Sequence, residues 1–218
     1  MKEIGGYMGL EQYHLPMLHG DGIKLNSGRS CLAYLIKVKN IRKIALPYFM
    51  CDVVIDVCKE YGVEIRFYST GFNFKPEEVG IDDGEWFYLT NYYGQLTSED
   101  ILFYQKKYGR LIVDCVQAYY QEPVKGVDTL YTCRKFFGVA DGGILYTDGQ
   151  YKGKLEQDES FPYMTFLLGR YERTGSEFYP SMKENDLRFA KTPIKRMSKL
   201  TENLLHSIDY EEIIPIAI

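Results

Sequence analysis

The chain has 218 residues, of which 45% are hydrophobic and 26% are charged, and its formal net charge is −4. This length suits one large domain, alone or with an appendage, and the composition is that of a globular protein rather than a disordered one. The mildly acidic balance has no block of Lys or Arg that would indicate nucleic-acid binding, and no run reaches the ~20 apolar residues needed to cross a bilayer. We therefore expect neither a nucleic acid nor a membrane as partner. The N-terminus lacks the apolar stretch of a signal peptide, so we expect a cytoplasmic protein.

Cysteine and histidine usage excludes several site chemistries. The cysteines are odd in number, contain no CxxC pair and lie mostly in apolar runs, so they predict reduced thiols in the core. They are Cys31, Cys51, Cys58, Cys115 and Cys133. The three histidines show no metal-ligand spacing, so we expect neither a metal site nor a histidine-based triad.

The first third of the chain predicts a strand, helix, strand unit. Apolar residues at helical spacing predict a helix over residues 28–39, and the apolar run 43–48 predicts a strand. A second helical pattern fills residues 52–61, and the alternating segment 63–68 predicts the next strand. Such a unit is typical of a parallel sheet with a right-handed crossover.

The same alternation continues to about residue 148. Thr97 and Asp100 form a candidate capping pair for a helix that ends near Tyr108. Further strands are predicted at residues 85–90, 110–115, 127–132 and 142–148. We therefore expect an α/β domain with a mostly parallel sheet over residues 1–150.

The character of the chain changes after residue 150. Segments 161–175 and 184–208 have helical patterns, and no strand is predicted between them. Residues 151–218 are therefore expected to form a helical tail.

Three polar groups are expected at the carboxyl ends of the strands, where open parallel sheets bind ligands. Asn26, Ser27 and Gly28 precede a helix, so its free N–H groups could bind a phosphate; an ordinary helix cap is the alternative. Asp114 ends a strand and could hold a cationic ring nitrogen, with Gln117 beside it; a carboxylate that caps a loop is the alternative.

The third group is Lys135, which lies in YTCRKFFGVADGG between a short strand and a glycine turn. A lysine in such a loop usually points into solvent. A catalytic lysine reacts through its neutral amine. The positive charge of the neighbouring Arg134 would favour that neutral form.

Five motifs occur in order in this chain: LNSGR, LPYFMCDVV, YYGQ, VDCVQA and RKFFGVADGG. Together they resemble the DegT/StrS family of aminotransferases that depend on pyridoxal 5'-phosphate (PLP). The resemblance covers Ile4 to Asp148 and extends more loosely through the tail. It implies the large domain of the aspartate aminotransferase fold, followed by the start of a truncated small domain.

The resemblance implies a role for each matching residue. Lys135 would hold the cofactor as a Schiff base, and Asp114 would keep the pyridine nitrogen protonated. Gln117 follows Asp114 at the family's spacing. Phe49 matches the aromatic residue that stacks on the cofactor, with Tyr48 as the close alternative.

The phosphate of the cofactor would be bound by a second set of residues. Ser27, Gly28 and Arg29 match the phosphate loop, and Thr132 supplies a further hydroxyl. Arg29 differs from the small hydroxyl residue of many members, although an arginine can also bind phosphate.

The resemblance implies an aminotransferase that uses PLP, takes an amino donor and a keto-sugar nucleotide as substrates, and forms a homodimer. Related sugar dehydratases replace the lysine with histidine, which Lys135 argues against. A catalytically incomplete PLP-fold protein or binding subunit is another alternative, because the small domain is expected to be largely lacking. The segment between Asp114 and Lys135 is shorter than in typical sugar aminotransferases, which bears on the identity of the substrate. A dinucleotide-binding domain is disfavoured because no GxGxxG follows the first strand.

Overall fold

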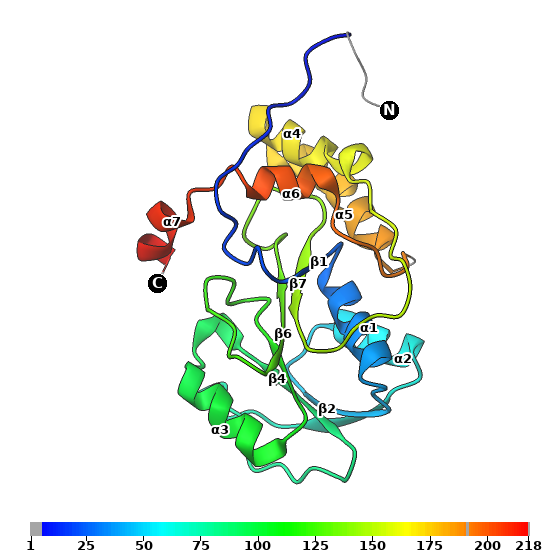
Figure 1. Cartoon of the computed structure of the whole chain (residues 1–218), viewed down its shortest axis with the longest axis vertical. Helices are drawn as coiled ribbons and strands as arrows, with labels where there is room; N and C mark the ends of the chain where they lie inside the picture. Colours follow the sequence, from blue (N-terminus) through cyan, green and yellow to red (C-terminus); the bar gives the residue numbers. More distant parts are fainter. Residues whose placement is uncertain (1–5, 191, 218) are drawn as a thin grey trace.

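The computed structural model describes residues 6–190 and 192–217; residues 1–5, which begin the predicted domain and include Ile4, and residues 191 and 218 of the predicted tail lie outside this range. Its centre is a seven-stranded sheet in the order β1-β7-β6-β5-β4-β2-β3 (Figure 1). The strands are β1 (Ile23–Leu25), β2 (Lys43–Pro47), β3 (Glu64–Tyr68), β4 (Trp86–Thr90), β5 (Leu111–Asp114), β6 (Asp128–Thr132) and β7 (Gly143–Tyr146).

The sheet is mostly parallel. Strands β2 to β6 pair in parallel, whereas β7 pairs antiparallel with both β6 and β1. The α/β class and the mostly parallel sheet are thus confirmed. Strand β1 was not predicted from the sequence, because three residues are too few to establish an alternating pattern.

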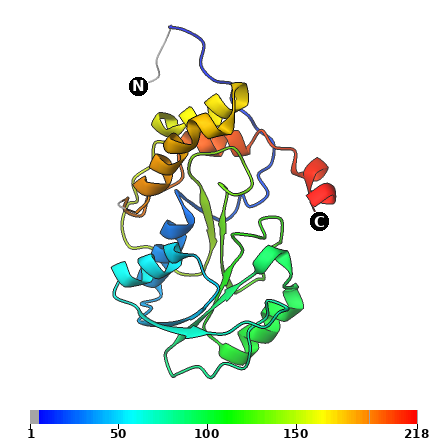
Figure 2. The same cartoon turned by 180° about the vertical axis from the view of Figure 1, so that it is seen from behind.

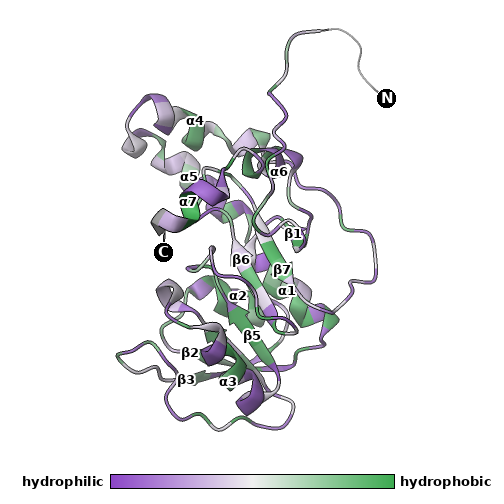
Figure 3. Cartoon of the chain, turned by 60° about the vertical axis from the view of Figure 1, so that its left-hand side comes forward, coloured by the Kyte–Doolittle hydropathy of each residue, from purple (hydrophilic) through white to green (hydrophobic). Residues whose placement is uncertain are grey.

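Helices cover both faces of the sheet (Figures 1 and 2). They are α1 (Gly28–Val38) and α2 (Asp52–Glu60), which pack with one buried cluster, and α3 (Ser98–Tyr108), which packs with the other. Successive strand residues alternate between the two clusters: Tyr88 and Ile112 face α1, whereas Phe87 and Leu111 face α3. Both faces of the strands are therefore buried, and the central strand β5 is hydrophobic in Figure 3.

Local capping explains where these helices begin. The predicted pair of Thr97 and Asp100 forms a full capping box at the start of α3. Cys51, which was expected in the core, is the residue before α2 and is exposed, because α2 starts at the rim of the sheet. The other four cysteines are buried, and all five are free thiols.

The tail is helical but less regular than predicted. Its helices are α4 (Thr165–Glu172), α5 (Tyr179–Arg188), α6 (Lys199–Leu205) and α7 (Tyr210–Ala217), with short 3-10 turns at Phe161–Tyr163 and Gly175–Phe178. The prediction of helix throughout residues 184–208 is wrong between α5 and α6. There Pro193 cannot continue a helix, and Arg196 instead forms isolated bridges with Leu25 and Gln157.

No helix among the described residues is long and apolar enough to span a membrane. The boundary at residue 150 between the predicted α/β domain and the predicted tail stays a prediction. Buried polar contacts join the tail to the start of α1.

Candidate functional site

A cavity of about 470 Å³ opens at the carboxyl ends of β5 and β6. This volume lies within the range of small-molecule sites, roughly 300–1,000 Å³. Its walls come from the start of α1, from α2, from the loop after β6 and from α5. The lining residues are Ser27, Gly28, Arg29, Leu32, Cys51, Val53, Val54, Val57, Tyr88, Asp114, Val116, Leu130, Thr132, Arg134, Lys135, Met182, Asp186 and Phe189.

Six of the eight predicted site residues line this cavity. They are Ser27, Gly28, Arg29, Asp114, Thr132 and Lys135. Residues more than 100 positions apart in the sequence thus line one cavity, because the carboxyl ends of parallel strands lie at the same edge of the sheet.

Asp114 ends β5 and is only 3% exposed. Its Oδ1 accepts a hydrogen bond from the Val116 backbone N–H at 2.9 Å, and its Oδ2 accepts one from the Tyr88 hydroxyl at 2.8 Å. Burial raises the pKa of this carboxyl group, and the two hydrogen bonds and the charge of Lys135 offset part of that rise. The bond to Val116 is the loop cap that the sequence offered as an alternative, and it leaves the carboxylate facing the cavity.

The loop that carries Lys135 is fixed by its own backbone. Phe136 and Phe137 donate backbone hydrogen bonds to the Cys133 carbonyl at 3.0 and 2.9 Å, and Cys133 donates one to the Gly142 carbonyl at 3.1 Å. Lys135 itself is exposed at the turn.

The glycine turn after this loop has a steric cause. A Cβ atom on Gly143 would lie 2.5 Å from the backbone carbon and oxygen of Ser27, closer than real Cβ contacts. Gly142 has a φ of +120°, and a Cβ there would lie 2.9 Å from the Cβ of Cys133. These two glycines therefore allow β7 to approach the start of α1 beside the Lys135 loop.

The start of α1 has both an N-cap side chain and backbone N–H groups that are free to donate hydrogen bonds. The Ser27 Oγ accepts a hydrogen bond from the Ser30 N–H at 3.2 Å, so this side chain acts as the ordinary N-cap. Within the described chain, the N–H groups of Gly28 and Arg29 have no hydrogen-bond partner. A Cβ on Gly28 would stand 3.9 Å from Thr132 and Val116, so the missing side chain leaves space beside these donors.

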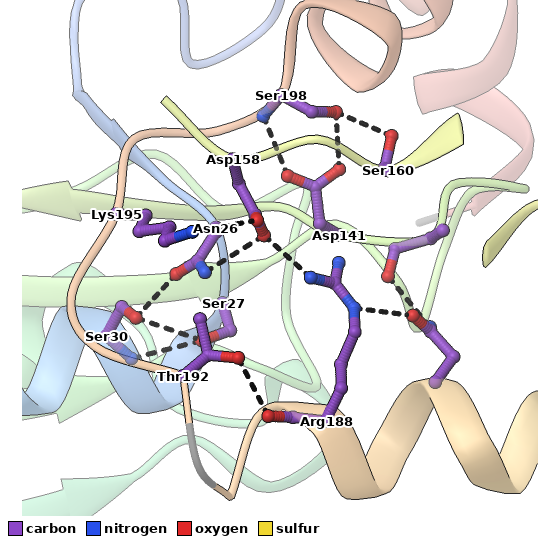
Figure 4. Close-up of polar contacts among 12 residues, drawn as sticks. Asn26, Ser27, Ser30, Asp141, Asp158, Ser160, Arg188, Thr192, Lys195 and Ser198 are labelled. Carbon is purple, nitrogen blue, oxygen red and sulfur yellow. Dashed lines mark hydrogen bonds and ion pairs between the residues drawn. The ribbon is translucent and has the colours of Figure 1, made fainter. Parts of the chain in front are cut away.

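Asn26 has a structural role instead (Figure 4). It is fully buried, its Nδ2 donates to Asp158 at 3.0 Å, and its Oδ1 accepts from the Ser30 hydroxyl at 2.5 Å. Arg188 of α5 donates to the same Asp158 carboxylate at 2.9 Å. This chain of contacts fixes the start of α1 to the tail.

A second buried carboxylate anchors α6 (Figure 4). Asp141 accepts hydrogen bonds from the backbone N–H and the hydroxyl of Ser198, both at 2.7 Å, and from the Thr201 hydroxyl. Burial raises the pKa of Asp141, and these donors offset part of the rise. Asp141 precedes the two glycines, so it ties the Lys135 loop to the tail.

Helix α5 forms a wall that the sequence reasoning missed. Met182, Asp186 and Phe189 line the cavity, and Asp186 pairs with Arg134. Their spacing of i, i+4 and i+7 places them on one helix face, which is the signal that could have identified them. Tyr88 was also missed, because a tyrosine inside an apolar strand is indistinguishable from a core residue.

Phe49, Tyr48 and Gln117 do not line the cavity. Phe49 is 58% exposed and stacks on Tyr92 with ring centroids 5.4 Å apart, and Tyr48 stacks on Phe67 at 5.3 Å. The Oε1 of Gln117 is buried without a hydrogen-bond partner among the described residues. The segment after β2 contributes Cys51, Val53 and Val54 to the cavity in place of an aromatic ring.

The side chains of the cavity fit PLP chemically. Free N–H groups and Arg29 suit a phosphate, Asp114 suits a protonated ring nitrogen, and Lys135 offers an amine for the aldehyde. The apolar lining from Leu32, Val54 and Leu130 suits the faces of a flat ring. No three His, Cys, Asp or Glu side chains gather as a metal site within residues 6–190 and 192–217.

No protein-family model and no curated protein matches the chain. Solved structures similar to this chain include sugar aminotransferases and a DegT/DnrJ/EryC1/StrS aminotransferase. One is a DegT DnrJ EryC1 StrS aminotransferase from Brucella abortus, with 14% identity and a TM-score of 0.47 over 58% of this chain and 41% of that one. Another is the sugar aminotransferase CalS13 from Micromonospora echinospora, with 13% identity and a TM-score of 0.48 over 56% and 40%.

A third neighbour is NtdA from Bacillus subtilis with bound cofactor PMP, with 14% identity and a TM-score of 0.49 over 59% of this chain and 33% of that one. The matched regions cover less than half of each of these three structures. At such identities the similarity concerns the fold alone.

Proposed function

We propose that this chain binds PLP through Lys135 and acts as an aminotransferase on a keto-sugar nucleotide. The observation that carries the proposal is a single cavity lined by Lys135, Asp114 and the start of α1. The ordered sequence motifs independently favour the same residues.

Each residue has a distinct task in this proposal. The N–H groups of Gly28 and Arg29 bind the phosphate, with the Thr132 hydroxyl close by, and Asp114 holds a proton on the ring nitrogen. PLP, when bound, supplies an electron sink for the α-carbon of the substrate. Lys135, which lines the same cavity, would carry a proton to and from that carbon.

The surrounding walls support this chemistry. Met182 of α5 and Phe189, the residue that follows α5, cover one side of the cavity, and Val53 and Val54 of α2 line the cavity as well. Apolar walls exclude water and strengthen the electrostatic contacts of Asp114 with a cationic ring.

A spectroscopic titration tests the proposed activity. Purified protein should gain a visible absorption band when PLP is added, and L-glutamate or L-glutamine should bleach it through a half-reaction. Lys135→Ala should lose the band, whereas Lys125→Ala, which alters an exposed lysine outside the cavity, should keep it. A wild-type protein that never gains the band contradicts the proposal.

A binding subunit without turnover is a second candidate. Both oxygens of Asp114 already accept hydrogen bonds, from Val116 and Tyr88, and this engagement favours the second candidate. A protein that takes up PLP but does not bleach with any amino donor would select it.

We also propose that the chain forms a homodimer through its large domain. Support comes from aromatic side chains exposed near the carboxyl ends of β2 and β4, since aromatic residues are enriched at protein interfaces. They include Tyr48, Phe49 and Tyr93, which are 70%, 58% and 63% exposed.

A further inference from the structure

Arg134 lies beside Lys135 in the wall of the cavity and has unused hydrogen-bonding capacity. Its side chain is 23% exposed, and its only ion pair among the described residues is with Asp186 of α5, through Nη2. Its Nε is buried and has no hydrogen-bond partner in the described chain. A guanidinium has five N–H donors, so this group can accept a further anion.

The guanidinium is held in a defined orientation. Its Cζ lies 4.8 Å from the ring centroid of Phe189, a side chain that is 5% exposed. The same ring has the Cζ of Arg188 at 4.1 Å, and Arg188 is fixed by Asp158 at 2.9 Å (Figure 4). Arg134 therefore stacks on a ring that cannot move freely, which reduces the entropy lost when it binds a ligand.

We propose that Arg134 binds the carboxylate of an amino-group donor in this cavity and that Asp186 occupies this position until the donor arrives. A planar guanidinium matches a carboxylate through two parallel hydrogen bonds. The pair with Asp186 shows that the position accepts a carboxylate. The identity of the ligand as an amino donor rests on the proposed function, because Lys135 and Asp114 line the same cavity.

Exchange of the two carboxylates costs little because the internal pair is weak. The Asp186 side chain is 43% exposed, so water screens its attraction to Arg134 and it loses little when displaced. Arg29 is the other arginine that lines the cavity, but it stands at the start of α1, where a phosphate would bind. The donor carboxylate is thus assigned to Arg134 rather than Arg29.

Calorimetric titration of the protein without PLP tests this assignment. The probe is glutarate, which has carboxylates but no amine, and glutaramide is the uncharged control. Wild-type protein should bind glutarate and not glutaramide. Arg134→Gln should weaken binding by about tenfold or more, and Arg134→Lys should weaken it less.

The variant Asp186→Asn separates a ligand site from a structural role. It removes the competing carboxylate at an exposed position, so glutarate should bind about threefold more tightly. Loss of a merely structural ion pair would leave glutarate affinity unchanged or lower it. The inference is overturned if wild-type protein does not bind glutarate, if Arg134→Gln binds it normally, or if Asp186→Asn fails to tighten binding.

The variant Lys135→Ala distinguishes this inference from the cofactor proposal. Lys135→Ala should still bind glutarate through Arg134, although it cannot hold PLP covalently. If PLP does not bind the wild-type protein while glutarate responds to Arg134 and Asp186 as described, the proposed function fails and the carboxylate site stands.

Discussion

At the scale of single residues, the buried carboxylate of Asp114 would control both the charge of the proposed site and part of its stability. Its pKa is raised in the folded protein, so the folded state keeps the proton to a higher pH than the unfolded state does. The stability contributed by this group is therefore fully present at low pH and is lost as the pH rises through the raised pKa. Asparagine has the same shape but no charge, so it would not lose stability in this way as the pH rises.

We predict that Asp114→Asn folds at least as stably as the wild type at neutral pH, because an amide oxygen can still accept from Val116 and the Tyr88 hydroxyl can accept from the amide. The difference in melting temperature in favour of the variant should grow as the pH rises. Its half-reaction rate with an amino donor should fall by orders of magnitude, since an amide does not favour a protonated ring nitrogen. A variant that reacts at the wild-type rate would show that Asp114 is only a loop cap.

The sequence alone predicted most of these residues but not all of their surroundings. Lys135, Asp114 and Gly28 were identified because each stands at a strand end or a helix start in a motif of fixed order. Asp186 and Tyr88 were missed because their roles depend on which side chain faces the cavity after folding. Phe49 was expected to stack on the cofactor, but it does not line the cavity and instead packs on Tyr92, which the sequence does not reveal.

At the scale of secondary-structure elements, the site depends on the close approach of β7 to α1. The strands with long apolar runs, such as β5, were predictable because both of their faces are buried. The three-residue strand β1 was not, because it depends on pairing with β7. The break between α5 and α6 was missed although Pro193 signals it.

We predict that Gly143→Ala lowers the free energy of unfolding by about 1–3 kcal/mol, because its Cβ would lie 2.5 Å from the Ser27 backbone and force β7 away from α1. PLP affinity should fall as well, since the start of α1 would shift. The matched control is Gly80→Ala, where a Cβ meets no atom within 4 Å. Urea unfolding of both variants measures the effect, and equal stabilities would contradict the role given to this contact.

At the scale of the whole molecule, the tail is joined to the sheet by buried polar contacts and by apolar side chains, such as Met197 and Leu205, that belong to the same hydrophobic cluster as the strands. Asp141 accepts hydrogen bonds from Ser198 and Thr201 of the tail, and Asp158 of the tail accepts one from Asn26 (Figure 4). The helical tail was predictable from its pattern. These contacts were not, because single polar residues in a sequence carry no information about their partners.

We predict that the chain is a dimer in solution, with about twice the 25.4 kDa mass of one chain by light scattering. Tyr93→Asp should shift the equilibrium toward monomer by placing a charge among the exposed aromatic rings. Aspartate tolerates the positive φ of 55° at this position, so the fold should persist. Tyr171→Asp, at a 94% exposed position on α4, is the control and should leave the dimer intact. A monomeric wild-type protein refutes the prediction.

The central claim is that Lys135 holds PLP in the cavity between β5, β6 and the start of α1. Borohydride reduction of the protein after incubation with PLP, followed by peptide mapping, tests it most directly. The account predicts a single phosphopyridoxyl label on the peptide that contains Lys135, with far less label in Gly28→Val, whose side chain would fill the space beside the free N–H groups. A label on another lysine, or no label at all, would contradict it.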